Sequence, residues 1–323
     1  MATTRSSATN DTADSVTRPM HAATPAHARE PRPDPVLGFY GPGTQMWRIN
    51  REAVLLGAGP CALLLQVAHP LVAEGVAQHS DFESDPAGRL RRTLRTTLDL
   101  VFGDGASAER AVGRLNSVHG SVRGTVDDPE ARHLAEHYRA LDPGLLLWVQ
   151  ATLIVTSVRA HERWVGPLSA AEKEAFWQEA RSVGRRIGIP LASSPPDWPA
   201  LAAYYEAMIG PDGPVRVTPT ARRLARSILR LPLPGLPAVA GELLTLPALA
   251  LLPARLRGAY ELPWGPGRER LARMLDLGVR LWVRALPTAW RSMPQALAAE
   301  RRARRDPGTS RERRARRAPP APR

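Results

Sequence analysis

Four pairs of a helix-capping residue and a proline precede helix-like segments of this chain. The pairs are Asp85-Pro86, Asp128-Pro129, Asp142-Pro143 and Thr218-Pro219. An Asp or Thr side chain can accept hydrogen bonds from the free N–H groups of a first helical turn. Proline suits the first helical position because it has no N–H group to satisfy there. Each pair therefore predicts the start of a helix.

Strand signals are scarce in comparison. Alternating runs of β-branched residues are nearly absent, and aromatic residues make up 5 % of the chain. Ser169 and Glu172 have the spacing of a capping box, which adds another helix start. Hydrophobic residues are 43 % of 323, enough for one large core. We predict an all-α fold with helices at about 46–69, 71–79, 86–102, 107–123, 129–141, 143–164, 169–187, 198–209, 219–230, 237–252 and 267–286.

The two ends of the chain differ in composition from its centre. Residues 1–35 are rich in Thr, Ala, Pro and Asp, and residues 291–323 carry 11 arginines against 3 acidic residues. Neither end has enough apolar residues to bury a core, so we expect both to be disordered. The basic tail suits weak contact with an anionic membrane surface, and no specific nucleic-acid site is indicated. Residues 36–290 are expected to form a single large helical domain.

Cysteine use and hydropathy suggest a compartment. Cys61 is the only cysteine, which excludes a disulfide framework and a zinc-finger spacing. The first 35 residues lack the apolar segment of a secretory signal. The apolar segments 53–68 and 241–254 are interrupted by glycine or proline, so we expect buried helices and no membrane span. These features favour the cytoplasm.

Two histidines lie near the end of the first apolar segment, in the sequence QVAHPLVAEGVAQHSDF. Pro70 follows His69 and removes the N–H group that would bond to the carbonyl of Gln66, so the chain should bend there. An unpaired charge in an apolar wall costs several kcal/mol, which requires a reason for His69 and His79. Both side chains could border a pocket; alternatively, His79 ends the helix and only His69 points inward.

Three polar residues share one face of the helix after Asp85. Arg89, Arg92 and Thr93 are spaced at i, i+3 and i+4, alongside an apolar stripe formed by Leu90, Leu94, Thr97, Leu98 and Val101. Two cations and a hydroxyl group in this arrangement suit an anionic ligand or a developing oxyanion. Arginines whose stems pack at the edge of a core give the same pattern.

The following helix carries His119 on its expected inner face. That face is marked by Ala108, Ala111, Val112, Leu115, Val118 and Val122. Gly120 and Gly124 lie beside His119 and would allow a flat group or another helix to approach the backbone. A lone inward histidine is more commonly a hydrogen-bonded core residue than a ligand, and both interpretations are kept.

Several motifs together resemble a known family. The segments LLLQVAHPLVAEGVAQHSDFESDPAGRLRRT, SVHGSVRGT, YRALDPGLLLWVQAT and LLPARLRGAYELPW are similar to those of the MpaB-type oxygenases, which include the catalytic domain of rubber oxygenase (latex-clearing protein). The resemblance covers about residues 36–290. It implies a globin-like helical bundle that encloses a b-type haem, and oxygenase chemistry with O2.

The resemblance also implies roles for individual residues. His119 matches the proximal iron ligand, and Arg89, Arg92 and Thr93 match a motif at the haem, with Arg92 standing where the rubber-cleaving relative has lysine. His69 belongs to the motif of the shorter relatives. Arg92, Thr93 and His69 are therefore candidates for catalysis, and His119, Arg89, Arg92 and His79 for binding haem b.

One further position departs from the family pattern. Gln150 stands where many relatives have histidine after Trp-Val, and an amide cannot accept a proton near neutral pH. The activity of this chain could therefore be altered. The aliphatic helices around the expected pocket suit a small apolar organic substrate.

Two alternatives to a haem oxygenase remain open at this point. His133 and His137 are spaced at i and i+4, and Glu130 with His133 forms one Glu-x-x-His, so a helix there could hold a non-haem metal. The second alternative is a non-catalytic helical protein that binds a ligand or a partner through its Pro- and Leu-rich C-terminal half.

Overall fold

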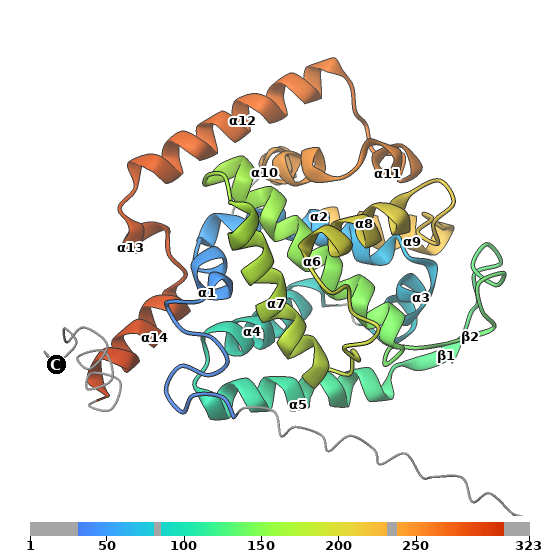
Figure 1. Ribbon diagram of the computed structural model, residues 1–323. Coiled ribbons are helices and arrows are strands. Elements are labelled where there is room, and N and C mark those ends of the chain that lie inside the picture. Colours follow the sequence, from blue (N-terminus) through green and yellow to red (C-terminus); the bar gives the residue numbers. More distant parts are fainter. Residues whose placement is uncertain (1–31, 81–84, 231–237, 307–323) are drawn as a thin grey trace, which may run out of the picture. The chain divides into compact units, whose positions relative to one another are not determined.

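The structure is a computed structural model that describes residues 32–80, 85–230 and 238–306. Within these ranges the regular structure is helical apart from one two-stranded antiparallel sheet, which confirms the all-α prediction (Figure 1). The expectation of disorder for residues 1–31 and 307–323 lies outside the described residues. The elements are α1 Gln45–Asn50, the 3-10 helix η1 Ala53–Ala58, α2 Gly59–Val67, α3 Pro70–His79, α4 Pro86–Phe102, α5 Gly105–Ser121, β1 Arg123–Thr125, β2 His137–Arg139, α6 Pro143–Trp164, α7 Ala170–Arg186, α8 Trp198–Ile209, α9 Pro219–Leu229, α10 Ala238–Leu251, α11 Ala254–Ala259, α12 Pro266–Ala285, α13 Thr288–Arg291 and α14 Pro294–Arg305.

The capping residues start most of the helices where the sequence predicts them. Asp85, Asp142 and Thr218 each accept a hydrogen bond from a backbone N–H group in the first turn of α4, α6 and α9. Ser169 and Glu172 form the reciprocal capping box of α7. These contacts join residues two or three positions apart, so they form regardless of the rest of the fold.

The helix expected over residues 46–69 is divided into α1, η1 and α2. Glu52 adopts an extended backbone at the break and pairs with Ser292 in an isolated antiparallel bridge. The amide N–H of Met293 also donates to the carbonyl of Arg51 at 2.7 Å. A contact with a distant segment thus replaces helical hydrogen bonds at this point.

The bend before Pro70 is confirmed. The segment Ala53–Val67 and helix α3 are inclined by 106°. The carbonyl of Gln66 accepts from the N–H of His69 at 3.2 Å, a tighter i to i+3 closure than that of an α-helix. His69 is therefore the last residue before the bend and the N-cap residue of α3.

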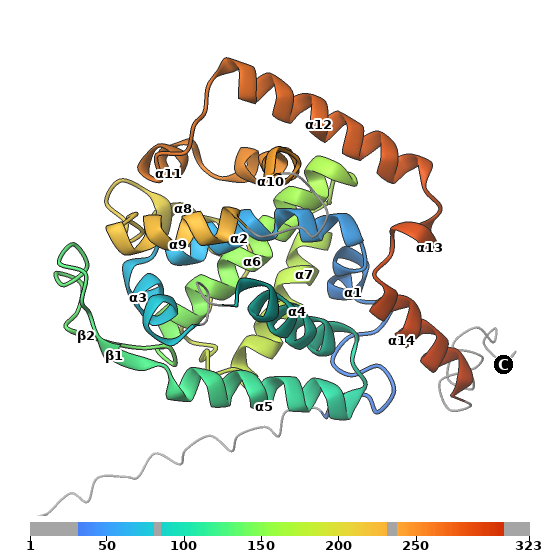
Figure 2. The same ribbon diagram turned by 180° about the vertical axis from the view of Figure 1, so that it is seen from behind.

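Helix α6 forms the centre of the core. It contacts α1, α2, α7, α8, α10 and α12, and it lies between several of them in both views (Figures 1 and 2). Trp148 and Trp164 on α6, and Phe176 and Trp177 on α7, are almost fully buried. By length and composition α6 could also cross a membrane, as could the bent pair of segments before and after Pro70; a buried core helix meets the same criteria.

The prediction of a helix over residues 129–141 is wrong. The chain forms a β-hairpin there, in which Arg123 pairs with Arg139. Asp128 does not start a helix: its Oδ1 accepts from the N–H of Glu130 at 3.0 Å and its Oδ2 from the N–H of Thr220 at 3.2 Å. The carboxylate holds the hairpin loop against the start of α9, a partner that local sequence does not reveal.

The expectation that disorder begins at residue 291 is also wrong, because α14 extends the folded chain to Arg305. Ala296, Ala299 and Ala303 form a buried stripe on one side of α14. Arg302 donates to the carbonyls of Val36 and Phe102, both at 2.9 Å. Alanines pack closely enough for arginine to reach these carbonyls, so an Arg-rich segment folds onto the body.

Candidate functional site

Three helix ends meet at the β-hairpin. The pairing of Arg123 with Arg139 brings the end of α5 beside the start of α6. Helix α3 reaches the same hairpin, since Gln78 Nε2 donates to the carbonyl of Thr125 at 3.0 Å and the Tyr138 hydroxyl donates to Gln78 Oε1 at 2.6 Å. Figures 1 and 2 both place α3, the end of α5 and the start of α6 next to the hairpin. The predicted histidines lie on these elements.

His69 is buried at the bend between α2 and α3, with 6 % of its surface exposed. Its Nδ1 is buried and finds no hydrogen-bond partner among the residues that the structure describes. Burial lowers the pKa of His69 to about 4, while the carboxylate of Asp142 at the start of α6 acts in the opposite direction. His69 is therefore a neutral imidazole at pH 7.

His79 has a different environment, at the end of α3. Its side chain is exposed, and its Nε2 lies 3.1 Å from the carbonyl oxygen of Arg123. Its ring stands edge-on to that of Tyr138, with 6.2 Å between centroids. His79 thus connects α3 to the hairpin, and of the two histidines only His69 is buried.

His119 lies in the last turn of α5 and is partly buried. Its Nδ1 is buried without a hydrogen-bond partner in the described part of the chain. Burial lowers the pKa of His119, so this imidazole is also neutral near pH 7. The neighbouring Gly120 is close to the start of α6: a Cβ atom there would lie 3.9 Å from Cδ1 of Leu141.

The apolar residues of α4 and α5 near His119 are only partly covered. Leu90, Leu94 and Leu98 on α4 are of intermediate exposure. On α5 the expected inner face is correct for Ala108 and Ala111, which are buried, but not for Val118, which is 58 % exposed. Helix α5 packs mainly on α4, so the far end of its apolar stripe lies beyond the closely packed core.

The three polar residues of α4 differ in burial. Arg89 is partly buried and its Nε donates to Ser80 Oγ at 2.5 Å. Burial, followed by the nearby charge of Arg92, lowers the pKa of Arg89 to about 10, so it stays a cation. Arg92 is exposed and forms an ion pair with Asp85 at 3.2 Å, and Thr93 is exposed. Of these three side chains, only Arg89 is partly buried.

Gln150 joins two helices of the core. Its Nε2 donates to the carbonyl of Ala180 on α7 at 2.8 Å, and its Oε1 is buried without a partner among the described residues. A Cβ atom at Gly184 would lie 2.9 Å from the amide group of Gln150. The residue that departs from the family pattern thus makes a specific contact between α6 and α7.

The non-haem metal alternative loses its structural basis. His133 lies in a turn and His137 in β2, and both are exposed, so they do not share one face of a helix. Within the residues described, no group of three or more His, Cys, Asp or Glu side chains is arranged to hold a metal ion. The spacing of i and i+4 would bring His133 and His137 together only in a helix, and the structure has a hairpin at these residues.

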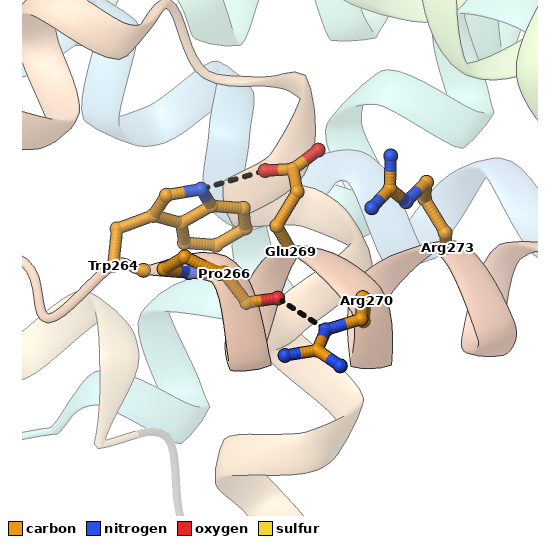
Figure 3. A pocket seen from close by; sticks show the side chains of 6 residues that line it. Trp264, Pro266, Glu269, Arg270 and Arg273 are labelled. Carbon is orange, nitrogen blue, oxygen red and sulfur yellow. Dashed lines mark hydrogen bonds between the residues drawn. The ribbon is translucent and has the colours of Figure 1, made fainter.

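A surface depression of about 460 Å³ lies at the start of α12 (Figure 3). Trp264 Nε1 donates to Glu269 Oε2 at 2.7 Å, and Arg270 Nε donates to the carbonyl of Pro266 at 3.2 Å. The guanidinium group of Arg257 stacks over the Trp264 ring at 4.4 Å. Neither His69 nor His119 lines this depression.

Comparison with known families identifies the chain. Residues 46–288 match the family described as ER-bound oxygenase mpaB/B'/Rubber oxygenase, catalytic domain. This chain belongs to that family. The match covers most of the chain and confirms the resemblance carried by the motifs around His69, Arg89 and His119.

Curated relatives of this oxygenase-family chain occur in mycobacteria. Uncharacterised proteins of Mycobacterium tuberculosis and Mycobacterium bovis are each 31 % identical over 238 residues, which span 71 % of this chain and 89 % of theirs. No solved structure shows a significant match to the chain.

The residues near the meeting point of α3, α5 and α6 at the hairpin fit the haem that the resemblance implies. Haem iron takes a neutral imidazole nitrogen, and both His69 and His119 are neutral with a buried nitrogen that lacks a partner in the described chain. The half-covered aliphatic side chains of α4 and α5 suit an apolar macrocycle, and the cation of Arg89 suits a carboxylate. Sequence reasoning missed the hairpin that brings these elements together.

Proposed function

We propose that this member of the oxygenase family is a haem b-dependent oxygenase, an oxidoreductase that acts on a small apolar organic substrate with O2. The observation that carries the proposal is the buried Nδ1 of His119, which has no partner among the described residues, on a helix that packs on α4 with its half-covered leucines. A buried polar atom without a hydrogen bond costs about 1–3 kcal/mol, and a bound ligand that uses the imidazole would remove this cost.

His119 is proposed to hold the iron, and the ring is suited to this at neutral pH. Burial keeps the imidazole neutral, so no proton has to leave before a nitrogen can bind a metal. A haem, when bound, supplies an iron that binds and activates O2. The ring nitrogen that does not face the iron would then donate its proton to a carbonyl or to water.

Arg89 and His69 are proposed to act around the cofactor. The charge of Arg89 is retained despite its partial burial, and a guanidinium group can pair with a carboxylate through two parallel hydrogen bonds. His69 stays neutral above about pH 4, so at pH 7 it donates one N–H hydrogen bond and does not serve as a general acid. It can orient a polar group in an otherwise apolar wall.

Arg92 and Thr93 are further candidates taken from the family motif. Arg92 pairs with Asp85 at the surface and Thr93 is exposed. Their catalytic roles, and cofactor binding by His79, stay predictions.

The test begins with the absorption spectrum of the purified protein. We expect a Soret band that shifts on addition of dithionite and again on addition of carbon monoxide. His119→Ala should lose most of this band while its far-ultraviolet circular dichroism is unchanged, because an alanine suits the end of α5. His133→Ala and His137→Ala are matched controls, since both histidines are exposed on the hairpin and should leave the band intact.

Two results would contradict the proposal in different ways. A folded His119→Ala protein with an unaltered Soret band, together with loss of the band in His69→Ala, would move the iron ligand to the bend between α2 and α3. A protein that takes up no haem when haemin is added would favour the non-catalytic helical binding protein instead.

A further inference from the structure

Helix α12 lies on the outside of the domain, and buried contacts determine which side of it faces inward. Asp276 is buried on the inward side of α12. Its Oδ1 accepts from Trp164 Nε1 and its Oδ2 from Arg163 Nε, both at 2.7 Å. Ala272 and Val283 are buried on the same side. Because α12 is attached through these residues, its opposite side is turned away from α6 and α10 (Figure 1).

The outward side of α12 is apolar. Met274, Leu277 and Leu281 follow each other at intervals of three and four residues, and they are 70 %, 58 % and 57 % exposed. Side chains at this spacing form one continuous stripe along a helix. Trp282 lies beside the stripe, one position after Leu281, and is 55 % exposed; Trp290 on α13 is 79 % exposed. Scattered apolar residues are normal on a protein surface, but a continuous stripe of large ones marks an interaction site.

Arginines accompany this stripe along one flank. Helix α12 contains five arginines and two acidic residues. Asp276 is buried and paired with Arg163 of α6, which leaves five arginines against Glu269, so the outer charge of α12 is positive. Arg273, Arg280 and Arg284 are exposed and lie on one side of the helix, at intervals of seven and four residues.

We propose that α12 and α13 form a membrane-docking surface that lies flat on an anionic lipid bilayer. Leucine, methionine and tryptophan would enter the boundary between head groups and acyl chains, and the arginines would pair with lipid phosphates. Tryptophan is enriched at this depth of a bilayer because its ring is both apolar and polar. The arginines interrupt α12 too often for it to cross the bilayer.

Charge decides between a membrane and a second copy of this chain. In a symmetric dimer with antiparallel copies of α12, Arg273, Arg280 and Arg284 of each chain would lie beside those of the other. In a dimer with parallel copies, these arginines would lie on opposite edges of the interface and would gain no opposite charge from α12. Like charges brought together at an interface oppose association. An anionic lipid surface removes this repulsion and satisfies the same arginines, so it is the occupant that both the charge and the apolar stripe favour.

The docking surface is independent of the proposed haem chemistry, so binding to vesicles tests it directly. The full chain is mixed with phosphatidylcholine vesicles prepared with or without phosphatidylglycerol, and the bound fraction is measured by sedimentation. We expect binding to the anionic vesicles that decreases as salt is added. Binding to the neutral vesicles should be at least tenfold weaker, because each arginine near an anionic surface contributes about fivefold in affinity.

Two sets of substitutions separate the apolar and the charged contributions. Met274→Gln with Leu277→Gln and Leu281→Gln should reduce binding to anionic vesicles about tenfold or more, since buried apolar area drives insertion. Arg273→Gln with Arg280→Gln and Arg284→Gln should remove the preference for anionic lipid. These side chains are exposed, so circular dichroism and haem content should not change.

A control uses exposed apolar residues elsewhere on the surface. Leu153→Gln with Leu191→Gln changes two residues that are 44 % and 40 % exposed on α6 and on the loop after α7. This variant should bind vesicles as the parent does. Equal losses in the control and in the α12 variant would overturn the assignment to α12.

Two other outcomes would also overturn the proposal. Absence of binding to anionic vesicles at low salt would show that the stripe does not dock on lipid. A dimer in sedimentation-equilibrium measurements without lipid, converted to a monomer by the substitutions at Met274, Leu277 and Leu281, would show that a second copy covers the stripe.

Discussion

Helices α6 and α5 begin with the same capping chemistry and end in very different environments. Asp142 caps α6 and Asp104 caps α5, each through its carboxylate and a first-turn N–H group. Trp148 on α6 is fully buried and stacks on Tyr205 with 5.9 Å between ring centroids, whereas Val118 on α5 is 58 % exposed. The difference shows that the elements packed around a helix, and not the residue that caps it, determine how deeply the helix is buried.

The neighbours of the two helices explain the contrast. Helix α6 contacts most of the other core helices, so most of its side chains are buried or partly buried. Helix α5 packs mainly on α4 and ends beside the hairpin. Residues of α6 therefore specify the fold, while residues near the end of α5 are available to bind a ligand. Five predictions test this division.

The largest effect is expected in the centre of the core. Trp148→Ala should lower the free energy of unfolding by about 3–5 kcal/mol, because it removes a fully buried ring and leaves a cavity. Val118→Ala on α5 should change it by no more than about 0.5 kcal/mol. Urea unfolding followed by circular dichroism measures both. Similar losses at the two positions would show that α5 is packed as closely as α6.

The second prediction concerns acid stability at the bend between α2 and α3. The folded protein holds the pKa of His69 near 4, below the ordinary value of 6.5. The unfolded chain therefore binds a proton between pH 6.5 and pH 4 that the folded chain does not. Stability is complete above about pH 6.5 and decreases as the pH falls to about 4, by at most about 3 kcal/mol from this group.

Substitution separates this contribution from those of other groups. Burial also lowers the pKa values of His119 and His161, so they destabilise the fold in acid in the same direction. The stability of His69→Gln relative to the parent should therefore rise as the pH falls from 6.5 to 4. A relative stability that is independent of pH would mean that His69 titrates normally.

The third prediction tests the attachment of α14. Arg302→Ala should cost about 1–3 kcal/mol of stability, since it removes two charge-assisted hydrogen bonds to the carbonyls of Val36 and Phe102. Arg304→Ala is the matched control: Arg304 is exposed on the same helix and should matter by less than about 0.5 kcal/mol. Equal effects of the two substitutions would place Arg302 in solvent.

A smaller effect is expected at the contact between α6 and α7. Gln150→His should retain haem and change stability by about 1 kcal/mol or less, because an imidazole N–H can replace the amide that donates to the carbonyl of Ala180. We expect a change in turnover or in the ferric absorption spectrum. If both equal those of the parent, Gln150 serves only to join the two helices.

The smallest effect is expected beyond α14. Deletion of residues 306–323 should leave haem content and melting temperature unchanged, because this segment is rich in arginine and has few apolar residues to bury. Deletion from residue 293 onward, which removes α14 as well, should lower the melting temperature clearly. A large loss from the shorter deletion would show that the last residues pack on the body.

The candidate site could be predicted in part. His69 and His119 are identifiable from motif and helical spacing, and the structure buries one nitrogen of each. Helical spacing places Arg92 and Thr93 on one face with Arg89. In the structure, however, Arg92 and Thr93 are exposed, whereas Arg89 is partly buried. Helical spacing tells which residues lie on one face; it does not tell how far the neighbouring helix covers that face.

The sequence by itself determined the helix starts at Asp85, Asp142, Ser169 and Thr218 and the bend at Pro70. These features depend on hydrogen bonds within one turn or on the ring of a single proline, so no distant residue is needed. Membership of the oxygenase family was also readable, because its motifs are continuous segments.

Only the tertiary structure decided the hairpin, the packing of α14 and the outward stripe of α12. Asp128 has the local pattern of a helix cap, yet its carboxylate bonds to the start of α9. The arginines of α14 suggest a solvated tail, yet Arg302 reaches two carbonyls that are 266 and 200 residues away in the chain. In each case the deciding partner is distant in sequence, and local patterns carry no information about such partners.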